Sequence, residues 1–173
     1  MRIRGVVAAL AVAASLLAAT PAGASEHRVS VVSNAGALSD LSVLTHDVTD
    51  RAKGAALAVS RDGVGTVVVL GLWGLDRSSA GTMYGAHVHV GACIAGDGAA
   101  AGKHYNATGG AVIDETTEVW LDFTVRRGGT AIAVSRVPFV IPQGGARSIV
   151  IHAMATLPNG TAGARLACLP LEF

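Results

Sequence analysis

The chain has 173 residues, of which 51% are hydrophobic and 14% charged, with a formal net charge of +1. This length and composition fit one ordinary globular domain. The near-neutral charge argues against a nucleic-acid partner or an anionic-membrane partner, because both select strongly basic chains.

The first 24 residues, 1–24, have the pattern of a secretory signal peptide. Arg2 and Arg4 precede an apolar run, and small residues in an A-x-A pattern end at Ala24. The alternative is an uncleaved membrane anchor, but this run is shorter than the roughly 20 residues that span a bilayer. Cleavage leaves 11 basic and 12 acidic residues and no other stretch that could cross a membrane. We therefore expect a secreted or extracytoplasmic protein.

Residues 25–52 are polar and interrupted by Ser, Asn and Gly, which predicts a flexible lead-in. The domain is expected at 53–173. Its first segments, 55–60 and 65–72, are rich in Val, Leu and Ala and flank the turn residues 61–63, so they predict a hairpin.

The rest of the domain alternates between short apolar segments and Gly- or Pro-rich turns. A long loop is expected at 91–110, and within 117–125 the apolar and polar residues alternate with period two. No segment after the signal has a sustained helical period. We predict an all-β fold, an antiparallel sandwich or barrel. The strands are expected at 86–90, 117–125, 131–140, 148–154 and 164–169.

Histidine and cysteine carry the recognisable chemistry. His87 and His89 share one face of a predicted strand, because strand side chains alternate, and this geometry can point two imidazoles at one metal ion. Such a pair alone is often structural. Together with His104 and His152 it suggests a transition metal, copper or zinc.

The chain has two cysteines, Cys93 and Cys168. An even count in an exported chain favours a disulfide. The alternative, two thiols that bind a metal, has no C-x-x-C spacing to support it.

Four short motifs occur along the chain: His87-Val88-His89 followed by Cys93, Gly102-Lys103-His104-Tyr105-Asn106, Ser148-Ile149-Val150-Ile151-His152, and Ala162-Gly163-Ala164-Arg165-Leu166-Ala167-Cys168. In sequence and order these motifs resemble those of the copper/zinc superoxide dismutase family, and the resemblance spans residues 55–169. The resemblance implies a Greek-key β-barrel that converts superoxide to oxygen and hydrogen peroxide. It implies copper ligands at His87, His89 and His152, a copper-zinc bridging imidazole at His104, an anion-guiding arginine at Arg165, and a Cys93–Cys168 disulfide.

Two departures from the family pattern narrow this expectation. No histidine lies between His104 and Trp120, and Asp114 alone cannot complete a zinc site. We therefore expect a copper-only member without zinc, with His104 as an ordinary copper ligand. The segment between His152 and Gly163 has no acidic residue, so the usual carboxylate support for the histidines is in doubt. The rival hypotheses are a copper-binding or copper-buffering protein without turnover and a barrel that has lost its chemistry. The oligomeric state is not predicted.

Overall fold

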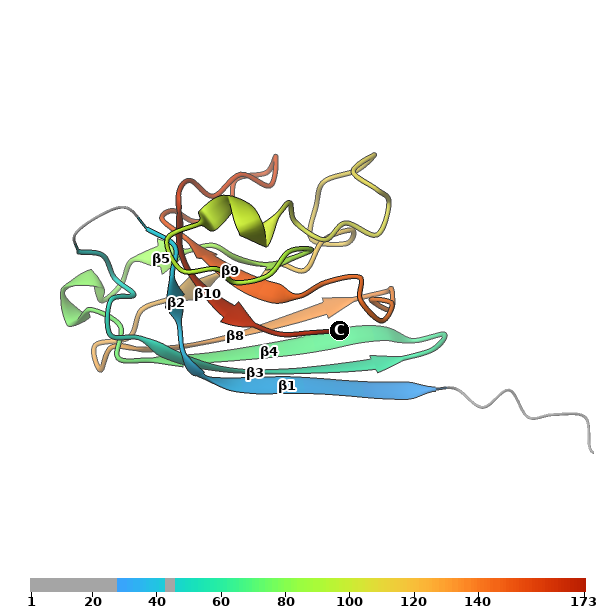
Figure 1. The fold of residues 1–173 in the computed structure, drawn as a ribbon, viewed down its shortest axis with the longest axis horizontal. Helices are drawn as coiled ribbons and strands as arrows, with labels where there is room; N and C mark the ends of the chain where they lie inside the picture. Colours follow the sequence, from blue (N-terminus) through green and yellow to red (C-terminus); the bar gives the residue numbers. More distant parts are fainter. Residues whose placement is uncertain (1–27, 43–45) are drawn as a thin grey trace, which may run out of the picture.

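A computed structural model describes residues 28–42 and 46–173, so the expected signal peptide lies outside the described residues. Two four-stranded antiparallel sheets, ordered β1-β3-β4-β8 and β2-β10-β9-β6, pack face to face, and β5 pairs with β7 (Figure 1). The elements are β1 Val29–Ala37, β2 Ser39–Asp40, β3 Lys53–Arg61, β4 Gly65–Trp73, η1 Arg77–Ser79, β5 Met83–Tyr84, β6 Ala86–His89, η2 Gly98–Ala101, β7 Phe123–Thr124, β8 Thr130–Val137, β9 Ser148–His152 and β10 Arg165–Pro170. None of the described helices is long and apolar enough to cross a bilayer.

The all-β prediction is confirmed, and its alternation builds the core. In β4, Val68, Leu70 and Leu72 are buried between the sheets, as expected for every second residue of a strand. Val88 of β6 and Ile149 of β9 meet them from the second sheet. The pairs β4–β8 and β6–β9 join strands that are distant in sequence, which is typical of Greek-key connections.

The lead-in is more ordered than expected, because β1 occupies Val29–Ala37 and pairs with all nine residues of β3. The sequence of β1 does not indicate a strand, because Val32 and Gly36 are its only partly buried residues and the others are exposed. An edge strand with most of its side chains outside the core needs little apolar periodicity. Beyond it, β2 crosses to the second sheet and pairs with β10.

Loops cover the outer face of the second sheet. The predicted disulfide is present: Cys93 in the loop after β6 is bonded to Cys168 of β10, across a sequence separation of 75 residues. Beneath it, Leu41, Ala101 and Val150 form a small apolar cluster apart from the main core. The disulfide and this cluster hold the 91–102 segment against the sheet, next to the two histidines of β6.

Candidate metal centre

Both edges of β6 are hydrogen-bonded. One edge pairs with β9, in the register His87↔Val150 and His89↔Ser148. On the other edge the backbone amide of Tyr105 donates to Val88 O, at 2.8 Å, and that of Leu121 donates to Ala86 O, at 2.7 Å. Segments from the predicted long loop and the predicted 117–125 strand are thereby fixed beside the histidines.

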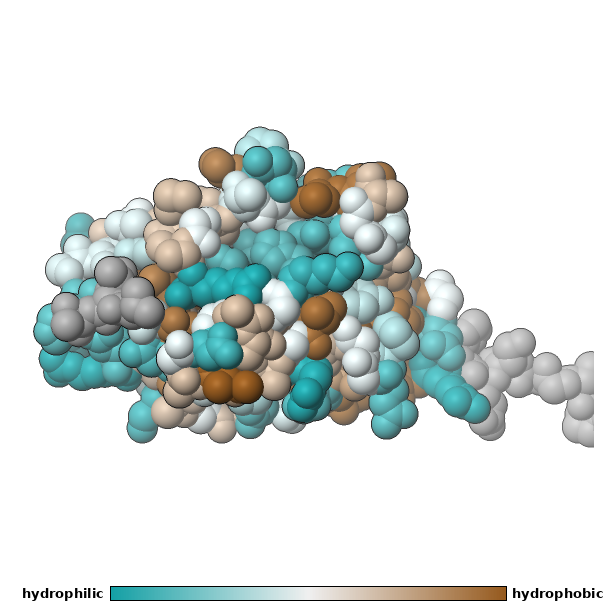
Figure 2. Space-filling model, turned by 45° about the horizontal axis from the view of Figure 1, so that its top comes forward, coloured by the Kyte–Doolittle hydropathy of each residue, from teal (hydrophilic) through white to brown (hydrophobic). Residues whose placement is uncertain are grey.

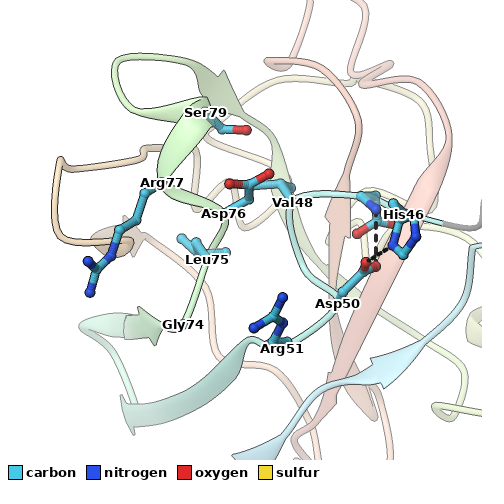
Figure 3. Close-up of a pocket in the computed structure, with 10 residues that line it drawn as sticks. His46, Val48, Asp50, Arg51, Gly74, Leu75, Asp76, Arg77 and Ser79 are labelled. Carbon is cyan, nitrogen blue, oxygen red and sulfur yellow. Dashed lines mark hydrogen bonds and ion pairs between the residues drawn. The ribbon is translucent and has the colours of Figure 1, made fainter.

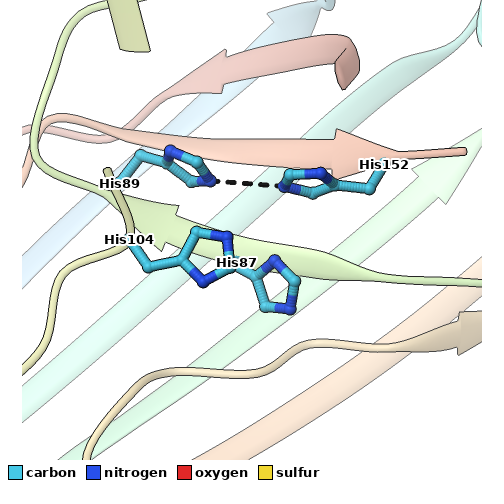
Figure 4. A group of neighbouring side chains, drawn as sticks. All are labelled: His87, His89, His104 and His152. Atoms are coloured by element: carbon cyan, nitrogen blue, oxygen red, sulfur yellow. Dashed lines mark hydrogen bonds between the residues drawn. The ribbon is translucent and has the colours of Figure 1, made fainter. Parts of the chain in front are cut away.

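The four predicted histidines lie together on the outer face of the second sheet (Figure 4). One ring nitrogen from each of them lies within 4.8 Å of the others, a group that could hold a metal ion. The side chains are His87 and His89 from β6, His104 from the adjoining segment and His152 from β9. The first two and His152 are buried, and His104 is partly buried.

The hydrogen bonds around the rings leave one nitrogen of each imidazole available. His89 Nδ1 lies 3.1 Å from Gly102 O and His152 Nδ1 lies 3.3 Å from Gly163 O, so their Nε2 atoms face each other at 3.3 Å. Both glycines have positive φ, 68° and 78°, a conformation that favours glycine and that places these carbonyls.

His87 is oriented the opposite way. Its Nε2 lies 2.7 Å from Thr156 Oγ1, and this hydroxyl donates to Asp122 Oδ1 at 2.6 Å. The backbone amide of Thr156 also donates to Asp122 Oδ2, at 2.8 Å. His87 Nδ1 is the one buried side-chain nitrogen or oxygen, among the described residues, that has no hydrogen-bond partner. A metal ion would satisfy this nitrogen.

Glu118 holds His104. The carboxylate Oε2 lies 2.8 Å from His104 Nδ1 and accepts from Trp120 Nε1 at 3.0 Å, and Oε1 accepts from Asn106 Nδ2 at 3.2 Å. Burial by itself raises the pKa of Glu118, but these hydrogen bonds outweigh it and keep the pKa below its usual range. The carboxylate thus fixes the proton of His104 on Nδ1 and leaves Nε2 for a metal.

Burial keeps the other three imidazoles neutral. It lowers the pKa of His152 to about 4 and that of His89 to about 2, and the neighbouring histidines and Arg165 add to the effect. Burial also lowers the pKa of His87, strongly. Neutral imidazole is the form that binds metals.

Arg165 lies next to this group. Together with His104 and His152 it lines a groove of about 580 Å³, and hydrophilic residues fill the hollow on this side of the molecule (Figure 2). Its partly buried guanidinium donates to Gly98 O and Gly102 O. Since Gly102 O also contacts His89, one carbonyl connects the arginine to the histidine group.

Three of the side chains that support the histidines were not recognised from the sequence. Within 117–125 the alternation of faces is correct, but only Phe123–Thr124 forms a regular strand pair. Glu118 contacts His104, and Asp122 accepts from Thr156, whose hydroxyl comes from the loop after β9. Asp114, the considered zinc ligand, instead accepts hydrogen bonds within its own turn, from Thr116 and Thr117.

A larger cavity, of about 710 Å³, lies between the segments 46–51 and 74–79 (Figure 3). The exposed His46 pairs there with Asp50 at 3.0 Å, and Asp76 caps η1 by accepting from Ser78. These polar groups are used in local turns, so the cavity is not the metal centre.

No protein-family model matches the chain, and no curated protein matches it. Among solved structures, the crystal structure of the clock protein EA4 is similar, with a TM-score of 0.55 and 16% sequence identity. The match covers 87% of this chain and 97% of that chain. At this identity the similarity shows the fold alone. The protein is therefore a disulfide-linked antiparallel β-sandwich with a four-histidine group that could bind a metal ion.

The buried histidines predict that the metal-free protein loses stability in weak acid. In the unfolded chain histidine titrates near 6.5, whereas His152 and His89 stay neutral in the folded chain down to about 4 and 2. Between pH 7 and 5 the unfolded state alone binds these protons, so the free energy of unfolding decreases as pH falls, by about 1–2 kcal/mol per histidine. Urea denaturation across this range measures it. A His89→Gln/His152→Gln variant should show a flatter dependence, and an equal slope in both proteins would contradict the prediction.

Removing the Thr156 hydroxyl should weaken metal binding. Thr156→Val keeps the shape of the side chain but leaves His87 Nε2 and Asp122 without their shared partner. We expect about 10–100-fold lower transition-metal affinity, measured by competition with a chromophoric chelator. Thr156→Ser retains the hydroxyl and should bind nearly as the wild type does. Equal affinity of the valine and serine variants would show that the hydroxyl does not position His87.

Proposed function

We propose that this protein is an exported, copper-dependent superoxide dismutase that holds one copper ion through His87, His89, His104 and His152. The observation that carries the proposal is the set of four imidazoles with one available nitrogen each, including the unpartnered, buried His87 Nδ1. All-nitrogen sets of this kind suit copper or zinc rather than the oxygen-seeking Mg²⁺ or Ca²⁺. Bound copper supplies one-electron exchange between Cu(II) and Cu(I).

The surroundings of His104 favour copper without a zinc partner. A bridging imidazole needs its second nitrogen free for zinc, but His104 Nδ1 is hydrogen-bonded to Glu118. A separate zinc site would also need protein ligands of its own, usually four. Among the described residues, the four histidines are the one group of at least three potential metal ligands. We infer that the carboxylate of Glu118 stands where the family has zinc.

Arg165 is suited to guide the superoxide anion. A guanidinium keeps its charge at working pH, although burial lowers its pKa, and its forked donors fit a small anion. The two glycine carbonyls fix its plane at the groove that His104 and His152 also line. Its charge raises the local concentration of anions there. Because this groove opens to solvent, water can provide the protons that hydrogen peroxide formation needs.

A copper-binding or copper-buffering protein without turnover is the second candidate. The loop between His152 and Gly163 carries no charged residue, so it adds nothing to anion steering. Thr156 of this loop contacts His87 directly and is itself held by Asp122, so the loop positions a histidine but adds no charge near the anion.

Metal analysis tests the binding step. Dialysed protein that was offered copper and zinc together should retain about one copper per chain and little zinc, because one four-nitrogen site is available. Inductively coupled plasma mass spectrometry gives the content. His89→Gln should lose most of the copper, whereas His46→Gln, at an exposed histidine outside the group, should retain it. Stoichiometric zinc beside copper would contradict the copper-only proposal.

Superoxide consumption tests the catalytic step. Copper-loaded Arg165→Ala should be about tenfold or more slower than the wild type, and its rate should depend less on ionic strength, because steering is lost. Arg165→Lys should retain part of the rate, and Arg127→Ala, at an exposed arginine elsewhere, all of it. Copper content of each variant is measured in parallel. A wild type that binds copper without consuming superoxide would favour the buffering protein. Full activity of copper-loaded Arg165→Ala would remove the arginine from the mechanism.

A further inference from the structure

None of the described residues covers the outer face of the first sheet, which is largely apolar. The loops and the second sheet lie on its other side (Figure 1), and the outward side chains of β1, β3, β4 and β8 remain exposed or partly exposed. The register places the apolar ones, with Ser33 among them, in three neighbouring rows across the strands. These rows are Val31–Val59–Val67, Ser33–Leu57–Val69–Val134 and Ala35–Ala55–Gly71–Ile132.

The exposure of this face is high for residues of this size. Val31 is 60% exposed, Ile132 53% and Val134 46%, and Leu57 in the middle row is 43% exposed. The second sheet differs, because its outer face is covered by the disulfide-linked loop and the histidine group. Single exposed hydrophobic residues are ordinary, but adjoining ones on a flat sheet indicate a surface that binds something.

All charges that the four strands place on this face have one sign. Lys53 lies at one end beside Trp73, whereas Arg61 and Arg136 lie at the other end. None of the four strands contains an aspartate or glutamate. The near-neutral net charge of the whole chain conceals this local distribution. An apolar strip with cations at both ends is complementary to an apolar surface that carries anions.

We propose that this face binds the surface of a bilayer that contains anionic lipids. Four strands about 4.8 Å apart and three rows about 7 Å apart cover on the order of 400 Å². A stable dimer needs about 800 Å² from each partner. A second copy packed on the face would also oppose Lys53, Arg61 and Arg136 with its own cations. A bilayer accepts a flat apolar face, and its anionic headgroups attract the flanking arginines and lysine.

Vesicle sedimentation with the purified protein tests the proposal. More protein should pellet with phosphatidylglycerol–phosphatidylcholine vesicles than with phosphatidylcholine alone, and added salt should reduce the difference. Ile132→Glu should bind about fivefold or more weakly, because it places an anion on the face. Ile94→Glu is the matched control, since Ile94 is 52% exposed but lies outside the sheets. In a Trp120→Phe variant, Trp73 is the remaining tryptophan, and its fluorescence should shift to the blue with anionic vesicles.

Three results would overturn the proposal. One is equal pelleting with neutral and anionic vesicles, and another is equal binding by Ile132→Glu and Ile94→Glu. The third is a dimer on size-exclusion chromatography that Ile132→Glu dissociates, because a second copy would then cover the face. Thermal unfolding of both glutamate variants confirms that they are folded.

Discussion

The candidate metal centre depends on hydrogen bonding along both edges of β6. A strand bonded on one edge only would present His87 and His89 but would have nothing to position His104. Here β9 binds one edge and supplies His152, while the backbone around Tyr105 binds the other edge. Side-chain alternation then puts Val88 in the core and both histidines on the outer face. Main-chain hydrogen bonds therefore bring the four histidines together, and further hydrogen bonds to the rings orient each imidazole.

Three kinds of support hold the four imidazoles, and the supports decide which nitrogen of each ring is available. Glycine carbonyls hold His89 and His152, a hydroxyl linked to a carboxylate holds His87, and a carboxylate holds His104. Burial removes the charged form of His87, His89 and His152, so these three rings are neutral before any metal arrives. Neutral rings with assigned protons give a preorganised donor set, which lowers the rearrangement that metal binding requires.

Local pattern and motif order predicted the hairpin, the all-β class and the disulfide, because each leaves a signal within a few residues or in a residue count. The contacts of Glu118 and Asp122 leave no such local signal. The alternation expected within 117–125 is correct, but alternation does not tell whether the polar side of this segment meets solvent or another segment. No sequence pattern marks Thr156, since its contact with His87 depends on a loop that folds back over β6. Similarly, β1 was missed because an edge strand with few buried side chains leaves little apolar periodicity.

Side chains alternate in the same way in both sheets, but the outer faces of the two sheets differ. In both, alternate residues fill the core between the sheets, and what distinguishes them is the cover on the outer side. The long segments after β6 and β9 cover the second sheet, and only a covered face can bury histidines, lower their pKa values and support them by hydrogen bonds. The hairpins of the first sheet are too short to cover its outer face, so its valine, leucine and isoleucine side chains stay exposed. The core between the sheets is built from other residues, so it does not require these exposed side chains to be apolar. Their position on the same face as Lys53, Arg61 and Arg136 is better explained by a surface that this face contacts than by the stability of the sandwich.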